Sequence, residues 1–244
     1  IKEITKALDK IKMTNKQTIK FTTEVFNLIK TSKTILELES IADKLQIPEK
    51  NRMTIDSYPK IEFDIKPNEI KSLIEKNLIN EDLSFSKNIT EKLTDPLTKL
   101  LYATAWKNGD LKKIKHIIKG ILESQKENDK QNHALVFYQF GKYLTKTQGQ
   151  PIIDQHVIRA FAIYKETDTE NVEKLRKLET LDKKQKPLIA EYKQWLISDN
   201  ISDELKNNTD YSYHIDKLLY AAGKTIKLQK QRKTKSTNAN NVTN

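Results

Sequence analysis

The chain has 244 residues, of which 36% are hydrophobic and 32% charged, and it carries a net charge of +11. This composition is typical of a globular protein with a sizeable core, and no apolar run approaches the roughly 20 residues of a membrane span. The lack of cysteine excludes disulfides, thiolate zinc sites and cysteine-ligated iron–sulfur clusters, and because no signal peptide is visible we expect a cytoplasmic protein without a membrane partner.

Helical periodicity dominates the first part of the chain. Apolar side chains recur at helical spacing over 2–13, 15–31 and about 33–46, and the third pattern ends before Pro48. We therefore predict an N-terminal helical unit over residues 1–47. Only five glycines and six prolines interrupt the whole chain, so we expect more than half of it to be helical.

Residues 48–66 are the clearest break in this pattern. They contain Pro48 and Pro59, and an alternation of apolar and acidic side chains follows from Ile61 to Ile65. Such an alternation is typical of a short strand, but an extended connector fits the same residues. We predict a connector over 48–66, with at most one short strand pair near 58–66.

Four helices are predicted in the central region. One covers about 67–78, two form a helical hairpin over 95–124, and the fourth covers 132–145. Gly141 lies on the apolar side of the fourth helix. A glycine at this position indicates either a close approach by a neighbouring helix or the end of the helix.

Another helix begins after Asp154. The run Pro151-Ile152-Ile153-Asp154-Gln155-His156-Val157-Ile158-Arg159-Ala160-Phe161 starts as a short apolar approach and continues as an amphipathic helix. The spacing predicts Asp154 as the residue that caps this helix, a role worth about 1 kcal/mol. Such a carboxylate faces the unpaired backbone N–H groups of the first turn. This capping role is compatible with a catalytic role for the same residue.

Two further helices are predicted near the C-terminus. Their apolar side chains recur over 186–198 and about 211–230, and the second is expected to face the core. Residues 231–244 are polar, basic and without periodicity, so we predict a disordered basic tail.

The segment around Asp154 resembles a known family. It is similar to the stretch after the hairpin in helix-hairpin-helix DNA glycosylases, where an aspartate precedes an "xHVxRV"-like helix and serves as the catalytic carboxylate. The resemblance covers about 95–164 and is specific only around 150–161. It implies an all-α, multi-helix, glycosylase-like arrangement over 67–230, to which the N-terminal helical unit is added.

This resemblance also implies a function. We expect a DNA-binding protein that cleaves the N-glycosidic bond of a damaged or modified base, with Asp154 as general base and charge stabiliser. Lys130, Lys142 and Arg159 are candidate contacts to the phosphates of duplex DNA. In the family a lysine after the hairpin forms a Schiff base, but that position falls here at Asn132. We therefore expect a monofunctional enzyme.

One departure from the family pattern concerns the hairpin itself, which falls near 124–134. Family members bind a DNA phosphate through a glycine-rich hairpin, and this segment contains no glycine. The alternative function is a non-catalytic helical module that binds nucleic acid or protein and retains Asp154 as a cap. An enzyme needs an open pocket at this carboxylate, whereas a module predicts that it is covered.

Other kinds of site find little support in the sequence. His133 and His156 match no zinc motif, and no phosphate loop, dinucleotide-binding glycine pattern or nucleophile elbow is present, so we expect neither a metal nor a cofactor. Tyr102, Trp106 and Trp195 lie at helical spacing among apolar residues and are predicted to pack in the core. The identity of any protein partner stays open.

Overall fold

The computed structural model describes residues 13–56, 58–126 and 131–228, and every regular element among them is a helix. The β contact within these residues is an isolated antiparallel bridge between Ile79 and Phe85. The all-α prediction is therefore confirmed, and more than half of the described residues are helical. None of the helices in these ranges has the length and apolar character needed to cross a lipid bilayer.

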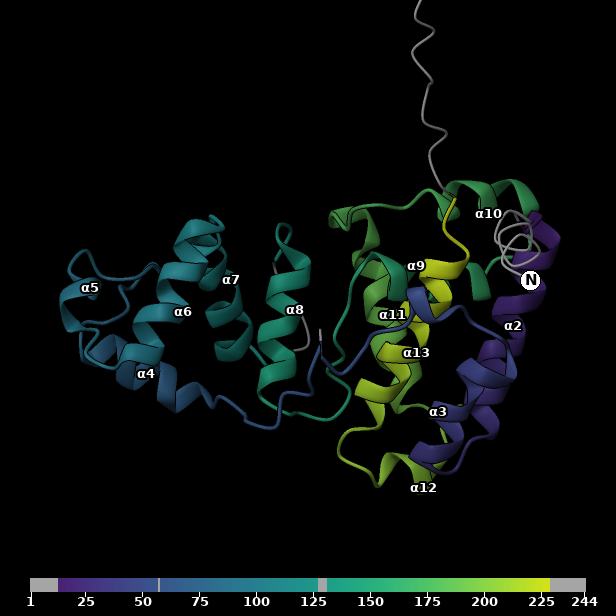
Figure 1. The fold of residues 1–244 in the computed structure, drawn as a ribbon, viewed down its shortest axis with the longest axis horizontal. Helices are drawn as coiled ribbons and strands as arrows, with labels where there is room; N and C mark the ends of the chain where they lie inside the picture. The colour runs from purple at the N-terminus through teal and green to yellow at the C-terminus, as the bar shows by residue number, and fades with distance from the viewer. Residues whose placement is uncertain (1–12, 57, 127–130, 229–244) are drawn as a thin grey trace, which may run out of the picture.

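The helices form two groups (Figure 1). We call α4–α8 the small lobe and α2, α3 and α9–α13 the large lobe. The bounds are α2 Asn15–Thr31, α3 Ile35–Lys44, η1 Glu49–Asn51, α4 Pro67–Glu75, α5 Ile89–Lys92, α6 Pro96–Lys107, α7 Leu111–Leu122, α8 Leu135–Leu144, α9 Gln155–Tyr164, α10 Thr169–Arg176, η2 Lys183–Gln185, α11 Lys186–Ile197, α12 Asp203–Lys206 and α13 Tyr211–Thr225. The shorter helices α5, α10 and α12 were not predicted from the sequence. The expected helix over 2–13 and the tail over 231–244 lie outside the described residues.

The N-terminal helices begin with strong local signals. Thr14 and Thr34 each cap a helix, and each forms a reciprocal capping box with the residue three positions later, Gln17 or Glu37. The buried side of α2 then packs into one hydrophobic core with α3, α9, α11 and α13. Residues before the connector and residues more than a hundred positions later thus share the core of the large lobe.

The described residues of the connector over 48–66 form no strand. After η1 its backbone is irregular, and it contacts the end of α8 through two hydrogen bonds: Ile65 N donates to Leu144 O (2.9 Å), and Lys146 Nζ donates to Ile61 O (2.6 Å). A strand needs a ladder of backbone bonds to a neighbour, and a single such bond does not provide one. The extended connector is therefore the form observed, and the predicted strand pair is absent from the residues described there.

In the small lobe, α7 and α8 cross at two glycines. A Cβ on Gly141 would lie 2.0 Å from the carbonyl oxygen of Ile117, and one on Gly120 would lie 2.0 Å from that of Tyr138. The prediction of a close approach at Gly141 is confirmed. Around this crossing, Ile118 and Ile121 pack with apolar residues of α4 and α8.

Helix α6 is packed far less than its pattern suggests. None of its residues is buried, and Leu97, Leu100, Leu101 and Trp106 are 61 to 66% exposed. The prediction that Trp106 packs in the core is wrong, because α6 turns the helix face that carries Tyr102 toward Phe85 and leaves its other faces in solvent. Trp195, in contrast, is in the core of the large lobe as predicted.

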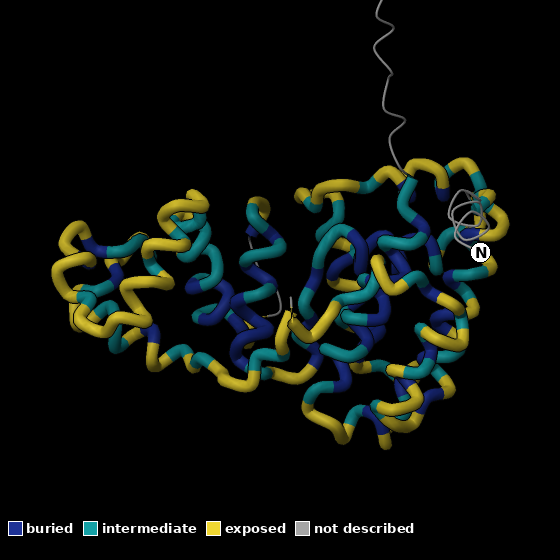
Figure 2. The backbone as a smooth tube through the Cα atoms, in the orientation of Figure 1, coloured by how far each residue is buried: buried dark blue, intermediate teal, exposed yellow. Residues whose placement is uncertain are grey.

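The large lobe is built around α9. All eight residues from His156 to Ile163 are buried, and buried backbone continues through the neighbouring α13 (Figure 2). The amphipathic pattern predicted one solvent-facing side for α9. No such side exists, because α2, α10, α11 and α13 surround the helix.

We expect Gly141→Ala to destabilise the protein by about 2 kcal/mol or more, because the new methyl group would collide with backbone atoms of α7. In an ordinary helix interior the same change stabilises by up to about 1 kcal/mol, so the sign of the effect is diagnostic. Urea unfolding measures it. The control is the reverse change, Ala103→Gly, on the exposed face of α6, which should destabilise by no more than about 1 kcal/mol. A stabilised Gly141→Ala variant would contradict the close helix crossing.

Candidate functional site

Asp154 caps α9, as the sequence predicts. Its Oδ1 accepts hydrogen bonds from His156 N (2.7 Å) and Val157 N (2.9 Å), which satisfies two of the unpaired donors of the first turn. Its other oxygen, Oδ2, accepts no hydrogen bond from any residue that the structure describes. One oxygen of the carboxylate therefore has a structural role, and the other has no such role among the described residues.

The surroundings make this carboxyl more basic than an ordinary aspartate. Asp154 is half-buried, and burial raises its pKa, while the two backbone N–H groups and the charge of Arg159 oppose the shift. A general base works best when its pKa lies closer to the working pH, so a raised pKa favours proton abstraction. This shift is compatible with a catalytic role and is also found in purely structural carboxylates.

The segment that leads to Asp154 is held from both lobes. The buried carboxylate of Asp216 on α13 accepts from Ile152 N (2.6 Å) and from the Tyr192 hydroxyl (2.6 Å), and burial raises the pKa of Asp216 well above its usual value. From the small lobe, Gln139 Nε2 donates to Pro151 O (3.2 Å). The backbone just before the cap is therefore fixed by side chains of α8 and α13.

On the other side of Asp154, the first turn of α9 is pressed against α13. A Cβ on Gly223 would lie 2.0 Å from the carbonyl oxygen of His156, so only glycine allows this approach. Arg159 stabilises this contact between α9 and α13. Its Nη1 donates to Gly223 O (2.9 Å) and to His156 Nδ1 (2.7 Å), and its Nη2 donates to Leu178 O. Asp154 thus projects from a rigid helix start.

Arg159 does not lie where a phosphate contact requires it. It is 0% exposed, and its guanidinium bonds to backbone carbonyls and to the imidazole of His156. The reason is the burial of α9 on every side, which leaves no polar face for this residue. Burial lowers the pKa of Arg159 to about 10, so it stays charged at neutral pH and stabilises the lobe from within.

Lys142 is also buried instead of facing DNA. It is 0% exposed, its Nζ donates to the carbonyl of Lys126 (3.0 Å), and the ammonium lies 5.1 Å from the centre of the Tyr138 ring. The contact with α7 covers this part of α8, which the apolar pattern of α8 alone does not reveal. The third candidate, Lys130, lies outside the described residues.

The residue immediately before α8 has a positive φ although it is not a glycine. Ala134 adopts a left-handed conformation (φ 52°, ψ 39°) immediately before α8, and no side chain caps that helix. Next to it, Gln131 accepts from Lys119 Nζ (3.0 Å) and donates to the carbonyl of His133. The unpaired N–H groups at the start of α8 therefore lie beside a lysine of α7.

Sequence reasoning did not identify Gln139, Asp216, Tyr192 and Gly223 as positioning residues. A signal existed for Asp216, which follows Ile215 and precedes Leu218 and Leu219 on a helix expected to face the core. An acid among such residues needs buried partners. For Gln139 and Tyr192 the sequence offers no comparable signal, because both residue types are common on half-exposed helix faces.

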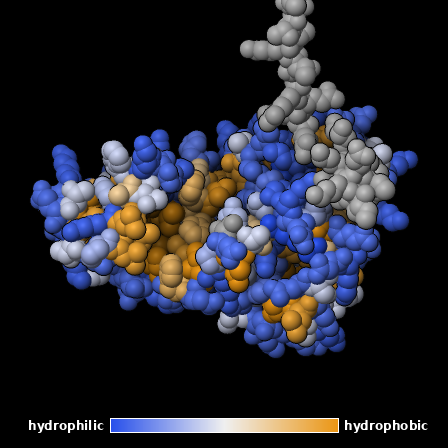
Figure 3. Space-filling model, in the orientation of Figure 1, coloured by the Kyte–Doolittle hydropathy of each residue, from blue (hydrophilic) through white to orange (hydrophobic). Residues whose placement is uncertain are grey.

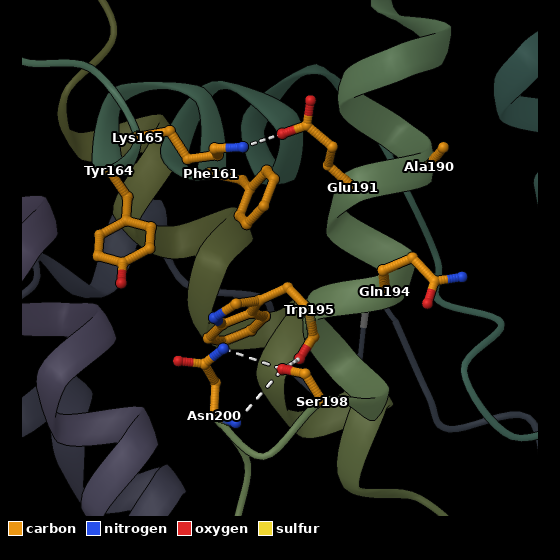
Figure 4. A pocket seen from close by; sticks show the side chains of 9 residues that line it. All are labelled: Phe161, Tyr164, Lys165, Ala190, Glu191, Gln194, Trp195, Ser198 and Asn200. Carbon is orange, nitrogen blue, oxygen red and sulfur yellow. Dashed lines mark hydrogen bonds and ion pairs between the residues drawn. The ribbon is translucent and has the colours of Figure 1, made fainter.

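A pocket of about 480 Å³ lies at the opposite end of α9 (Figure 4). Phe161, Tyr164 and Trp195 form its apolar wall, and the ion pair between Lys165 and Glu191 crosses its rim. Asp154 does not line this pocket. The cavity and the capping carboxylate are therefore separate features, and the pocket does not extend the candidate site.

Comparisons with protein-family models, with curated proteins and with solved structures found no match. Within the described part of the chain, no cluster of three or more histidine, aspartate or glutamate side chains is arranged to hold a metal ion. The Nδ1 atom of His156 accepts a hydrogen bond from Arg159, so this nitrogen is not available as a metal ligand. The candidate site therefore consists of one carboxylate and its positioning residues.

The folded state should resist protonation of His156. Burial and the charge of Arg159 lower the pKa of His156 from its ordinary 6.5 to about 4, so the unfolded chain binds this proton more readily. The stability that depends on the neutral imidazole is complete above pH 6.5 and is lost as the pH falls toward 4, by about 3 kcal/mol. Urea unfolding at pH 7 and at acidic pH should show a smaller loss for His156→Gln than for wild type. Equal losses in the two proteins would contradict the buried Arg159–His156 contact.

Proposed function

We propose that this chain binds DNA and hydrolyses the N-glycosidic bond of a damaged or modified base. The observation that carries the proposal is the carboxylate of Asp154, which is held at the start of a buried helix, has a raised pKa and keeps Oδ2 free of hydrogen bonds within the described residues. In this proposal Asp154 orients and deprotonates water and stabilises the positive charge that develops on the sugar.

The order of elements supports a helix-hairpin-helix glycosylase-like arrangement, to which the N-terminal helices are added. Helix α7, the turn before α8, α8 itself, the Asp154 cap and α9 follow one another in the order of the resembled family. Ala134, with its positive φ, stands near the glycine-rich turn of that family. Asn132 occupies the position of the Schiff-base lysine, which supports hydrolysis without a lyase step.

Contacts to DNA phosphates are assigned to the exposed lysines of α7. Lys112 and Lys115 lie on the solvent side of this helix, and Lys119 reaches the segment before α8 through Gln131. These lysines replace Arg159 and Lys142, which are buried. Lysine contributes charge neutralisation with little base readout, so the proposed duplex binding is weak and strongly dependent on salt.

The second candidate function is a non-catalytic module that binds nucleic acid or protein. One observation favours it: Asp154 Oδ1 is fully used as a helix cap, which is sufficient reason for an aspartate at this position. In both functions Asp154 caps α9 and so contributes to folding. Only the first function requires Asp154 to act as a catalytic base. Substitution at this residue therefore separates them.

Asp154→Asn should leave the fold intact and abolish base excision. Asparagine caps a helix nearly as well as aspartate, so the free energy of unfolding should change by about 1 kcal/mol or less. Because the amide cannot accept a proton or supply full negative charge, single-turnover base release should fall by roughly 100-fold or more. The measurement uses a panel of duplexes that each carry one damaged or modified base.

Asp168→Asn is the matched control for this experiment, because Asp168 caps α10 in the same way and has no proposed role in catalysis. Thermal melting of both variants controls for folding. Excision by a folded Asp154→Asn variant would exclude this carboxylate as the base. An inactive wild type that still binds duplex DNA would favour the non-catalytic module.

Lys112→Gln combined with Lys115→Gln should weaken binding to undamaged duplex DNA. Each lost phosphate contact reduces the slope of log affinity against log salt by about 0.9, so two contacts reduce it by about 2. Fluorescence anisotropy across a salt series measures this slope. Lys174→Gln combined with Lys177→Gln, two exposed lysines at the end of α10, is the control and should leave the slope unchanged. An unchanged slope for the α7 variant would contradict the assigned DNA face.

A further inference from the structure

Helix α6 carries an apolar stripe that nothing described in this chain covers. Leu97, Leu100, Leu101 and Thr104 recur at helical spacing along one side, and the three leucines are 61 to 64% exposed. Figure 3 shows hydrophobic side chains gathered on this part of the small lobe, where the surface is hollowed. A helix of this length is marginal in water without tertiary packing, so the stripe marks a missing contact.

The polar atoms along this stripe are already satisfied. Thr104 Oγ1 donates to Leu100 O (2.9 Å) within the helix, and Thr98 Oγ1 donates to Asp95 Oδ2 (2.6 Å) at the cap. An apolar partner can therefore cover the stripe without leaving a buried hydroxyl unpaired. This property suits a packed helix–helix contact.

The residues beside the stripe indicate what kind of partner fits. Thr98, Ala103 and Ala105 flank the leucines, and Lys99 lies on the opposite side of the helix. Small flanking side chains allow another helix to approach closely. A nucleic acid or an anionic membrane would instead need several cations beside the apolar residues, as in basic amphipathic helices, whereas on α6 only Lys107, the last residue of the helix, lies on that side.

We propose that α6 is a self-association surface, on which the α6 helix of a second copy of this chain packs antiparallel. With a two-fold axis between Leu100 and Leu101, Leu100 of one copy meets Leu101 of the other, and Leu97 meets Thr104 of the other copy. Asp95 at the start of one helix then lies near Lys107 at the end of the other. The stripe is thus complementary to itself in shape and in charge.

The expected affinity follows from the size of the surface. The exposed leucines form a patch on the order of a few hundred Å² per copy, compared with about 800 Å² per partner in a standard interface. The dimer is therefore expected to be weak. Each copy carries +11, so salt strengthens the association by screening repulsion, whereas it weakens binding to DNA.

Sedimentation of the full chain over a wide concentration range tests this proposal. Wild type should form dimers that strengthen with salt, and Leu100→Ser combined with Leu101→Ser should weaken the dimer by about tenfold or more. Leu36→Ser, at a leucine of α3 that is even more exposed (79%), should leave it unchanged. Because the chain lacks cysteine, Leu101→Cys provides a second test: a short bis-maleimide should link two copies, whereas Leu36→Cys should link far less.

Circular dichroism of each variant controls for folding, and the cross-linking result stands even if the double serine variant unfolds. A wild type that stays monomeric at every concentration would overturn the proposal. So would equal cross-linking at positions 101 and 36. Binding of duplex DNA or of phosphatidylserine vesicles that depends on Leu100 and Leu101 in a monomeric chain would show that the stripe serves a different partner, and would also overturn it.

Discussion

The contact between the first turn of α9 and α13 at Gly223 is the constraint on which the candidate site depends. No Cβ fits between Gly223 and the carbonyl oxygen of His156, so the two helices touch through their backbones. Asp216, less than two helical turns earlier on α13, holds Ile152 N on the other side of the cap. One helix therefore fixes the chain both before and after Asp154. A side chain held by two such anchors loses little further freedom on binding a substrate, which is the requirement for a preorganised group.

Burial of charge accompanies this rigidity. Arg159 bonds the carbonyls of Gly223 and Leu178, and Arg176 bonds those of Ile226 and Met13, so each buried guanidinium joins segments that are distant in sequence. Asp216 does the same with a backbone N–H and a tyrosine hydroxyl. A buried charge is costly unless it is hydrogen-bonded, and these groups use backbone atoms that would otherwise lack partners. Their role is to orient helices, and this explains why Arg159, one of the predicted phosphate contacts, is internal.

For this chain, the sequence predicts local structure much better than it predicts which side chains are exposed. Caps, prolines and periodicity located the longer helices, identified Asp154 as a cap and indicated the close approach at Gly141, because each of these signals acts within a few residues. Exposure depends on which elements meet. Periodicity assigns Arg159 to the polar side of α9 and Trp106 to a core, yet α9 is enclosed by four helices and α6 by almost none. The positioning residues Gln139 and Tyr192 act across more than ten and more than twenty residues of sequence, beyond the reach of any local pattern.

Capping and catalysis require different things of Asp154. Oδ1 accepts the capping hydrogen bonds, and Oδ2 accepts none from the described residues. A cap needs one acceptor oxygen, and Oδ1 fulfils that need with two backbone bonds. Nothing in capping requires the chain ahead of the helix to be fixed by Asp216 and Gln139, or the carboxyl to be half-buried with a raised pKa. At the surface cap Asp168, the backbone ahead of the helix is held by the neighbouring Glu166 carboxylate, which accepts from Thr167 N and Asp168 N, and not by buried side chains of other helices. The additional positioning around Asp154 suits a reacting carboxylate, and the proposal of hydrolysis rests on it.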